Sequence, residues 1–257
     1  MTGITILPLV PVRASQNERS EMTTQLLFGE CVEILETQER WLNVRNLNDN
    51  HTGWINSKMV CILDKEQELA LINKSPYCVS QPLLVCKNSS GEEMFLPGGS
   101  LLPAYSNGKC SIANETFTLK SIEETYTESI TGEKIAALAK QYLNAPYLWG
   151  GKSILGIDCS GLVQVVFSIA GISLPRDSDQ QVDNGIVIDF ISEAKAGDLA
   201  FFEDNEGNII HVGILLNSKQ VIHAVGWVQI EPIDSQGIIS TITGKYTHKL
   251  RVIKRLV

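Results

Sequence analysis

Cys159 lies at the predicted start of a helix, a position that can activate a cysteine as a nucleophile. Cys159 opens the apolar run CSGLVQVVFSIA, which predicts a buried helix with Asp158 as its N-cap and Gly171 at its end. The backbone N–H groups and the dipole at a helix start stabilise a thiolate, so we expect the pKa of the Cys159 thiol to lie below its ordinary value. The alternative is an apolar cysteine that only fills the core.

Two histidines follow in consecutive apolar runs and could complete the chemistry. His211 lies in NIIHVGILL and His223 in QVIHAV, with the turn-forming residues 217–219 between them. A hairpin with a loop over 216–218 would set the two histidines directly opposite one another on one face. One imidazole could then take the thiol proton while the other fixes its orientation and tautomer. Two histidines buried in the core remain the alternative.

A zinc site is the competing interpretation of the same three residues. Cys159, His211 and His223 could supply three ligands, with water as the fourth, as in catalytic zinc sites. However, no two of the six cysteines have CxxC spacing, and no known zinc motif is present. The sequence therefore favours catalysis by cysteine, without a metal or an organic cofactor, and reduced cysteines elsewhere.

The overall charge excludes several classes of partner. The chain has 21 basic and 29 acidic residues, a formal net charge of −8, which is not the footprint of a protein that binds nucleic acid or anionic lipid. The stretch 1–12 lacks the basic start of a secretory signal, and no run approaches the roughly 18 apolar residues of a membrane helix. We therefore expect a cytoplasmic protein with no nucleic-acid or membrane partner.

The elements that must position these residues lie in the stretch 130–257. Apolar residues at helical spacing predict a helix over 132–143, which Pro146 ends. After Gly197 the pattern changes to strands, expected at 198–202, 208–216, 220–225, 228–231 and 250–256. Helices followed by strands predict an α+β domain with an antiparallel sheet.

The stretch before residue 130 reads as small β modules. Short apolar runs separated by turn residues predict an all-β barrel over 1–64, with Trp41 and Trp54 in its core. Frequent prolines between 65 and 122 predict a second small β module, and the polar stretch Ser121–Ser129 reads as a linker. We expect three domains: 1–64, 65–122 and 130–257.

Six short motifs in the order found here carry a family resemblance. They are YLWGG (147–151), DCSGL (158–162), LPRDSDQQ (174–181), GDLAFF (197–202), IHVG (210–213) and VIHA (221–224). Together they resemble the NlpC-type cell-wall cysteine peptidases, whose fold is papain-like and α+β. The resemblance implies that Cys159 is the nucleophile, His211 the general base and His223 the orienting residue.

The front half resembles the bacterial SH3-like domains that precede the peptidase in an intracellular subgroup of this family. The run PVRASQNERSEMTTQLLFGE (11–30) carries this resemblance. It implies hydrolysis of the γ-D-glutamyl bond to a diamino acid, lysine or diaminopimelate. The implied substrates are murein tripeptides or tetrapeptides with a free N-terminal L-Ala, and the implied product is L-Ala-D-Glu, as in the recycling of cell-wall peptides.

The resemblance also implies a set of substrate-binding residues. They are Asp158, Ser160, Ser178, Trp149, Tyr147, Glu21 and His51. His51 stands where the subgroup has a tyrosine. From the residues alone, core packing would equally explain Trp149 and Tyr147, and a helix cap would explain Ser178.

Electrostatics leaves the role of Asp158 open. A carboxylate beside a thiolate raises the thiol pKa, so Asp158 is either a helix cap alone or the partner of a substrate amine. Arg176 could bind a substrate carboxylate or pair with Asp177 or Asp179.

Two other functions remain open on the sequence alone. One is an amidase or acyltransferase that uses the same Cys–His pair, and the other is a catalytically dead protein that binds cell wall.

Overall fold

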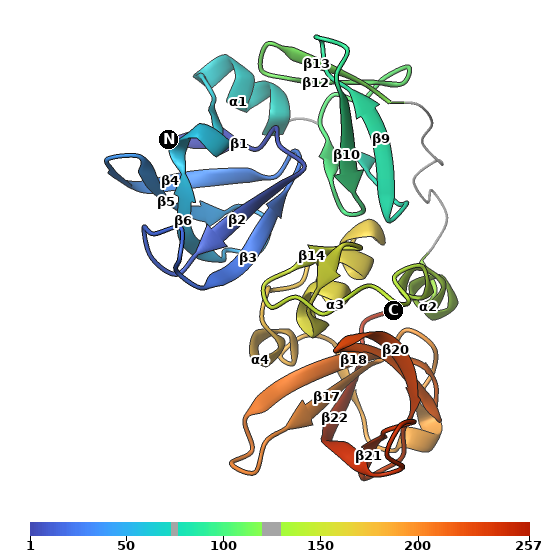
Figure 1. The fold of residues 1–257 in the computed structure, drawn as a ribbon. Helices are drawn as coiled ribbons and strands as arrows, with labels where there is room; N and C mark the ends of the chain where they lie inside the picture. Colours follow the sequence, from blue (N-terminus) through green and yellow to red (C-terminus); the bar gives the residue numbers. More distant parts are fainter. Residues whose placement is uncertain (73–76, 120–129) are drawn as a thin grey trace. The chain divides into compact units, whose positions relative to one another are not determined.

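The computed structural model describes residues 1–72, 77–119 and 130–257. The predicted linker Ser121–Ser129 and the end of the predicted second module at residue 122 lie outside the described residues. The chain divides into two compact units, Met1–Thr125 with Lys152–Ile154, and Tyr126–Gly151 with Leu155–Val257 (Figure 1).

The first unit begins with a seven-stranded antiparallel sheet in the order β3-β2-β6-β5-β4-β1-β7. Its strands, with one 3₁₀ helix, are β1 (Thr2–Ile4), β2 (Leu9–Arg13), β3 (Met22–Leu27), β4 (Cys31–Gln38), β5 (Trp41–Asn46), β6 (Thr52–Asn56), η1 (Ser57–Met59) and β7 (Cys61–Ile62). Aliphatic side chains fill its core: Val10, Val12, Leu26, Val32, Leu42, Val44 and Ile55. The predicted β module over 1–64 therefore has the expected strand content.

The two tryptophans of this sheet differ in burial. Trp41 is buried, as predicted, whereas Trp54 is only half-buried. Side chains alternate along β6, so Gly53 and Ile55 face inward and Trp54 faces the other way. The prediction that Trp54 fills the core is wrong because the inward position belongs to Ile55.

The rest of the first unit contains a helix and short strands. These are α1 (Lys65–Ile72), β8 (Tyr77–Cys78), β9 (Leu83–Lys87), β10 (Glu93–Pro97), β11 (Leu101–Leu102), β12 (Lys109–Ile112), β13 (Glu115–Leu119) and, from later in the chain, β14 (Lys152–Ser153). The sequence predicted only strands here. Asp64 and Gln67 start α1 because each side chain accepts the other's backbone N–H, at 2.9 and 3.1 Å.

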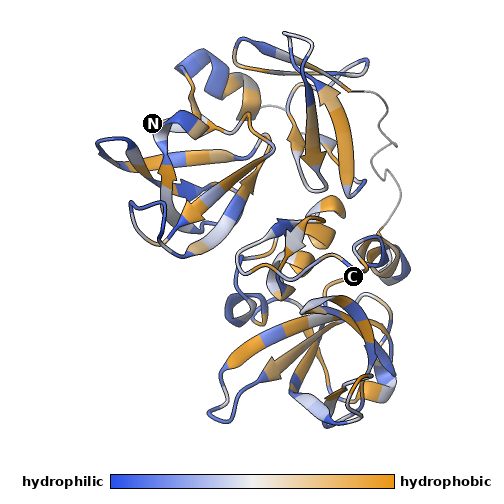
Figure 2. Cartoon of the chain, in the orientation of Figure 1, coloured by the Kyte–Doolittle hydropathy of each residue, from blue (hydrophilic) through white to orange (hydrophobic). Residues whose placement is uncertain are grey.

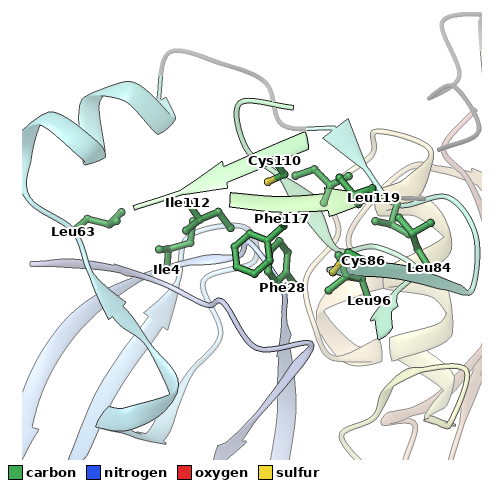
Figure 3. Close-up of a cluster of buried hydrophobic side chains, with 12 residues drawn as sticks. Ile4, Phe28, Leu63, Leu84, Cys86, Leu96, Cys110, Ile112, Phe117 and Leu119 are labelled. Atoms are coloured by element: carbon green, nitrogen blue, oxygen red, sulfur yellow. The ribbon is translucent and has the colours of Figure 1, made fainter. Parts of the chain in front are cut away.

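One apolar cluster is shared along the first unit (Figure 3). Ile4 and Phe28 pack with Leu84, Leu96 and other buried residues of the later strands. The rings of Phe28 and Phe117 meet edge to face, with centroids 4.8 Å apart. The early and late strands thus bury apolar surface against one another, and a domain boundary at residue 64 stays a prediction.

The second unit has few helices and one antiparallel sheet, which confirms the predicted α+β class. Its sheet has the order β16-β22-β17-β18-β19-β20, with β21 paired to β22. In Figure 2 its strands carry apolar segments, while the turn that joins β17 to β18 is polar. Its elements are α2 (Gly132–Lys140), β15 (Gly156–Ile157), α3 (Cys159–Ile169), α4 (Ser178–Gln181), β16 (Ile186–Ile188), η2 (Ile191–Glu193), β17 (Leu199–Glu203), β18 (Ile209–Asn217), β19 (Gln220–Val225), β20 (Trp227–Pro232), β21 (Gly237–Ile239) and β22 (Tyr246–Arg255).

The helix α3 forms as the sequence predicts and is buried along almost its whole length. Asp158 caps it by accepting the N–H of Gly161 at 2.7 Å. Gly171 follows its end with a φ of 78°, a left-handed conformation that glycine adopts without strain. In the described part of the chain, no helix is both long enough and apolar enough to cross a bilayer.

Candidate active site

Cys159 is the first residue of α3, and its side chain is almost wholly buried, with 7% of the residue exposed. Burial and, to a smaller extent, the Asp158 carboxylate raise the pKa of its thiol to about 11. Hydrogen bonds from the backbone N–H groups of Val212 and Ser160 lower the pKa of Cys159, but by less than burial raises it. The predicted lowering of this pKa is therefore wrong, because desolvation disfavours the thiolate more than the helix start favours it.

His211 and His223 lie on the adjacent antiparallel strands β18 and β19, as predicted, but not directly opposite one another. A bulge follows Leu215, and the register pairs Ile214 with Ile222. Continued by one residue, this register sets Gly213 against His223, so His211 is a diagonal neighbour on the same face. A Cβ atom on Gly213 would lie 2.6 Å from Val221 Cγ2 and 3.1 Å from the Cβ of His223, so a glycine allows β19 to approach this closely.

The two imidazoles belong to a buried hydrogen-bonded chain. His211 Nε2 lies 2.9 Å from His223 Nδ1, and His223 Nε2 lies 3.1 Å from Glu231 Oε2. All three side chains are buried. Sequence reasoning missed Glu231, although an acidic residue inside the apolar strand VQIEP was a signal that could have found it.

This geometry does not suit a shared metal ligand set. The facing nitrogens of His211 and His223 bond to each other and so do not converge on a common ion. Within the described residues, no group of three or more His, Cys, Asp or Glu side chains could hold a metal ion. The zinc interpretation therefore has no structural support in that part of the chain.

A third histidine, His248, packs against the pair. The ring centroid of His248 lies 4.4 Å from that of His211 and 5.8 Å from that of His223. Burial, helped by His223 and His248, holds the pKa of His211 well below its ordinary value, and burial lowers the pKa of His248 to about 4. His211 is therefore neutral at neutral pH, with a lone pair that can accept a proton.

Asp158 has a cationic partner within the protein. Its Oδ2 accepts from Arg176 Nη2 at 2.5 Å and from the N–H of Gly150 at 2.7 Å. Its Oδ1 accepts from the N–H of Gly161 and, at 3.4 Å, from Ser160 Oγ. These donors match the roughly four lone-pair positions of a carboxylate. The capping role of Asp158 is confirmed, whereas its contact with a substrate amine stays a prediction.

Arg176 forms a buried ion pair with Asp158, a partner that the sequence did not indicate, and the nearby charge of Asp177 also acts on it. Binding of a substrate carboxylate by Arg176 stays a prediction. Arg176 also donates from Nη1 to Ser160 Oγ at 2.8 Å, and both charged side chains are buried. The guanidinium offsets the negative charge that the carboxylate would otherwise place beside the thiol.

Comparisons with known proteins agree with this architecture. Residues 144–248 match the NlpC/P60 family, and residues 12–59 match the bacterial dipeptidyl-peptidase SH3 domain. A gamma-D-glutamyl-L-lysine dipeptidyl-peptidase from Bacillus subtilis is 31% identical over 78% of this chain and 71% of that protein. The chain belongs to the NlpC/P60 family. It is therefore a cysteine peptidase, and the family resemblance of the six motifs is confirmed.

Other NlpC/P60 relatives cover nearly the whole chain. Dipeptidyl-peptidase 6 from Lysinibacillus sphaericus is 27% identical over 95% of this chain and 98% of that protein. A crystal structure of an NlpC/P60 family protein from Bacillus cereus matches with a TM-score of 0.84 at 18% identity, over 99% of both chains. At 18% identity, the match to this crystal structure supports the fold alone.

The remaining predicted site residues of this NlpC/P60 peptidase have different surroundings. Tyr147 lies near the thiol, since burial, then Cys159, raises its pKa to about 12. Trp149 is 59% exposed, so core packing does not explain it. Ser178 is the first residue of α4, whose N-cap is Asp177, so the capping alternative for Ser178 is wrong.

Glu21 and His51 lie in the first unit. His51 Nε2 lies 3.1 Å from Thr23 Oγ1. The roles of Glu21 and His51 as pocket walls stay predictions.

The raised thiol pKa predicts how Cys159 reacts with iodoacetamide. Because burial raises this pKa to about 11, the thiol is protonated at neutral pH in the resting NlpC/P60 enzyme. The rate of Cys159 alkylation, followed by mass spectrometry of its peptide, should rise continuously with pH from about 6 to about 10, since the thiolate is the reactive form. A plateau reached below pH 7 would instead indicate a preformed thiolate–imidazolium pair.

Proposed function

We propose that this peptidase hydrolyses the γ-D-glutamyl bond to a diamino acid in murein tripeptides or tetrapeptides with a free N-terminal L-Ala, releasing L-Ala-D-Glu. The observation that carries the proposal is the hydrogen-bonded pair of His211 and His223 on strands that pack beside the helix that Cys159 opens. The name of the Bacillus subtilis relative, a gamma-D-glutamyl-L-lysine dipeptidyl-peptidase, supplies the substrate class and favours lysine over diaminopimelate as the diamino acid.

In the proposed mechanism Cys159 attacks the γ-glutamyl carbonyl while Nδ1 of His211 removes its proton. The backbone N–H of Cys159, at the start of α3, donates to the oxyanion that forms. His211 then protonates the departing α-amine of the diamino acid, which leaves a thioester on Cys159. Finally His211 activates water to hydrolyse the thioester, and His223 orients His211 throughout.

The proposed pocket combines two groups of residues. Tyr147 and Trp149 would line the cleft beside Cys159, and Ser160 and Ser178 would contact the peptide. Asp158 already binds Arg176, so we propose that Glu21 supplies the main negative charge for the substrate amine, with His51 as a further wall residue. The choice of pocket residues rests on the family resemblance, and the larger role of Glu21 rests on the ion pair of Asp158 with Arg176.

A closed pocket for the free amine would restrict the enzyme to peptides already released from the wall. The L-Ala of intact wall is joined to glycan through an amide, so it has neither the charge nor the room that such a pocket requires. We therefore propose a role in recycling murein peptides, and the cytoplasmic location stays a prediction that accompanies it.

The test compares L-Ala-γ-D-Glu-L-Lys with its N-acetylated form, with products identified by mass spectrometry. The free peptide should yield L-Ala-D-Glu and lysine. Acetylation removes the positive charge and adds bulk, so kcat/KM should fall by at least about 100-fold, equivalent to about 2.7 kcal/mol of transition-state stabilisation. Equal cleavage of both peptides, or digestion of whole sacculi, would contradict the proposal.

A matched pair of variants tests the amine site. Glu21→Gln should reduce kcat/KM for the free peptide by roughly tenfold or more and leave the acetylated peptide unaffected, because only the free form carries the charge. Glu18→Gln, an exposed position in the same loop, is the control and should change neither value. If the two variants behave alike, Glu21 does not bind the amine.

A further inference from the structure

We infer that Glu231 is a positioning residue that fixes the tautomers of His223 and His211, so that the lone pair of His211 faces Cys159. This inference rests on the proposed function, because it concerns the same Cys–His pair. It adds His223 and the buried carboxylate of Glu231 to that pair, which gives a series of four interacting side chains.

The carboxylate of Glu231 is held from two sides. Its Oε1 accepts the N–H of Thr241 at 2.9 Å and lies 3.4 Å from Thr241 Oγ1, while its Oε2 faces His223 Nε2 at 3.1 Å. The hydrogen bond from His223 lowers the pKa of Glu231, so the side chain is ionised at neutral pH and can only accept hydrogen bonds.

The ionised carboxylate of Glu231 fixes which group donates and which accepts in each hydrogen bond from Glu231 through His223 to His211. Since Glu231 only accepts, the Nε2 of His223 must carry the proton. A neutral His223 then has its lone pair on Nδ1 and accepts from the Nε2–H of His211, 2.9 Å away. The lone pair of His211 is therefore on Nδ1, the nitrogen left for the thiol.

The opposite tautomers would disable the base. A neutral His211 with its proton on Nδ1 would present an N–H to Cys159 and could not accept the thiol proton. The two rings that pack against His211, those of Phe202 and His248, do not impose the productive direction. Phe202 has no ring nitrogen, and His248 packs on the pair while its Nδ1 contacts Thr247 Oγ1 at 2.9 Å. The carboxylate of Glu231 is the group that selects the productive direction of the hydrogen bonds.

The substitution Glu231→Gln should reverse the chain without removing a partner. The backbone N–H of Thr241 can only donate, so it requires the amide oxygen of the new side chain. The amide NH₂ then faces His223 Nε2, which must become an acceptor. His223 would carry its proton on Nδ1, donate to His211 Nε2 and leave His211 with its proton on Nδ1.

The experiment measures tautomers and turnover separately. Nitrogen-15 NMR of histidine-labelled protein near pH 7 should place the proton of both rings on Nε2 in the native enzyme and on Nδ1 in Glu231→Gln. For L-Ala-γ-D-Glu-L-Lys, kcat should fall by at least about 100-fold with KM almost unchanged, because substrate contacts are intact and only the base is misoriented. A purely structural role for Glu231 would leave the tautomers as they are.

Glu203→Gln is the matched control. Glu203 is another carboxylate of the same sheet, with 8% of its side chain exposed, but it pairs with Lys249 and Arg251 rather than with a histidine. It should change neither the tautomers nor kcat.

Each outcome decides a separate claim. Native rings protonated on Nδ1, or a Glu231→Gln variant that reverses the tautomers and keeps full activity, would overturn the inference. The native spectrum decides the tautomers even if the variant does not fold. A native enzyme with the expected tautomers that cleaves no murein peptide would overturn the proposed function and leave the tautomer assignment standing.

Discussion

Replacing Cys159 with alanine should reduce hydrolysis of L-Ala-γ-D-Glu-L-Lys by at least about 10⁴-fold, to the background of the assay, because no other group would form the thioester. The fold should be retained, since alanine favours the first turn of α3 and only one sulfur atom is lost from a buried position. Steady-state kinetics and the far-UV circular dichroism spectrum measure the two effects.

Cys86→Ala makes the same substitution at another buried cysteine. Cys86 lies in the apolar cluster of the first unit, so its replacement should leave kcat unchanged while lowering stability by about 1 kcal/mol for the lost packing. Full activity of Cys159→Ala, or inhibition of the native enzyme by chelators, would argue against cysteine catalysis and in favour of a metal.

Replacing Arg176 with methionine should lower the free energy of unfolding by about 3–5 kcal/mol, because it leaves the buried Asp158 carboxylate without its cation. Methionine keeps much of the volume and removes the charge. Urea unfolding followed by fluorescence measures the change. The double variant Arg176→Met with Asp158→Asn should recover part of the loss, since no unpaired charge then remains buried.

Arg255→Met provides the comparison within the same unit. Arg255 pairs with Asp198, whose carboxylate is buried, but the arginine side chain is 22% exposed and covers the carboxylate from the solvent side, so its removal lets water reach Asp198. We expect a loss of about 1 kcal/mol, the range of partly solvated ion pairs. If the two arginine variants unfold at the same urea concentration, the Asp158–Arg176 pair does not stabilise the start of α3 as the structure implies.

The local features of the site could be predicted from the sequence. The cap at Asp158, the helix that Cys159 opens, its end at Gly171 and the strands that carry His211 and His223 were all predicted correctly. Each depends on interactions between residues a few positions apart, such as a capping hydrogen bond or the periodicity of apolar side chains. Such signals are legible in one sequence because they act over one turn of helix or one strand.

The electrostatics and the strand register of the site depend on contacts between elements that are distant in the sequence. The ion pair of Asp158 with Arg176, the contact of His248 with His211 and the carboxylate of Glu231 all join residues from different elements. The turn that pairs Asn217 with Gln220, together with a bulge after Leu215, makes the pairing of the two histidines diagonal and not direct. The pKa of Cys159 moved opposite to the prediction because desolvation depends on how completely the other elements cover the thiol, and the sequence around a helix start does not encode that.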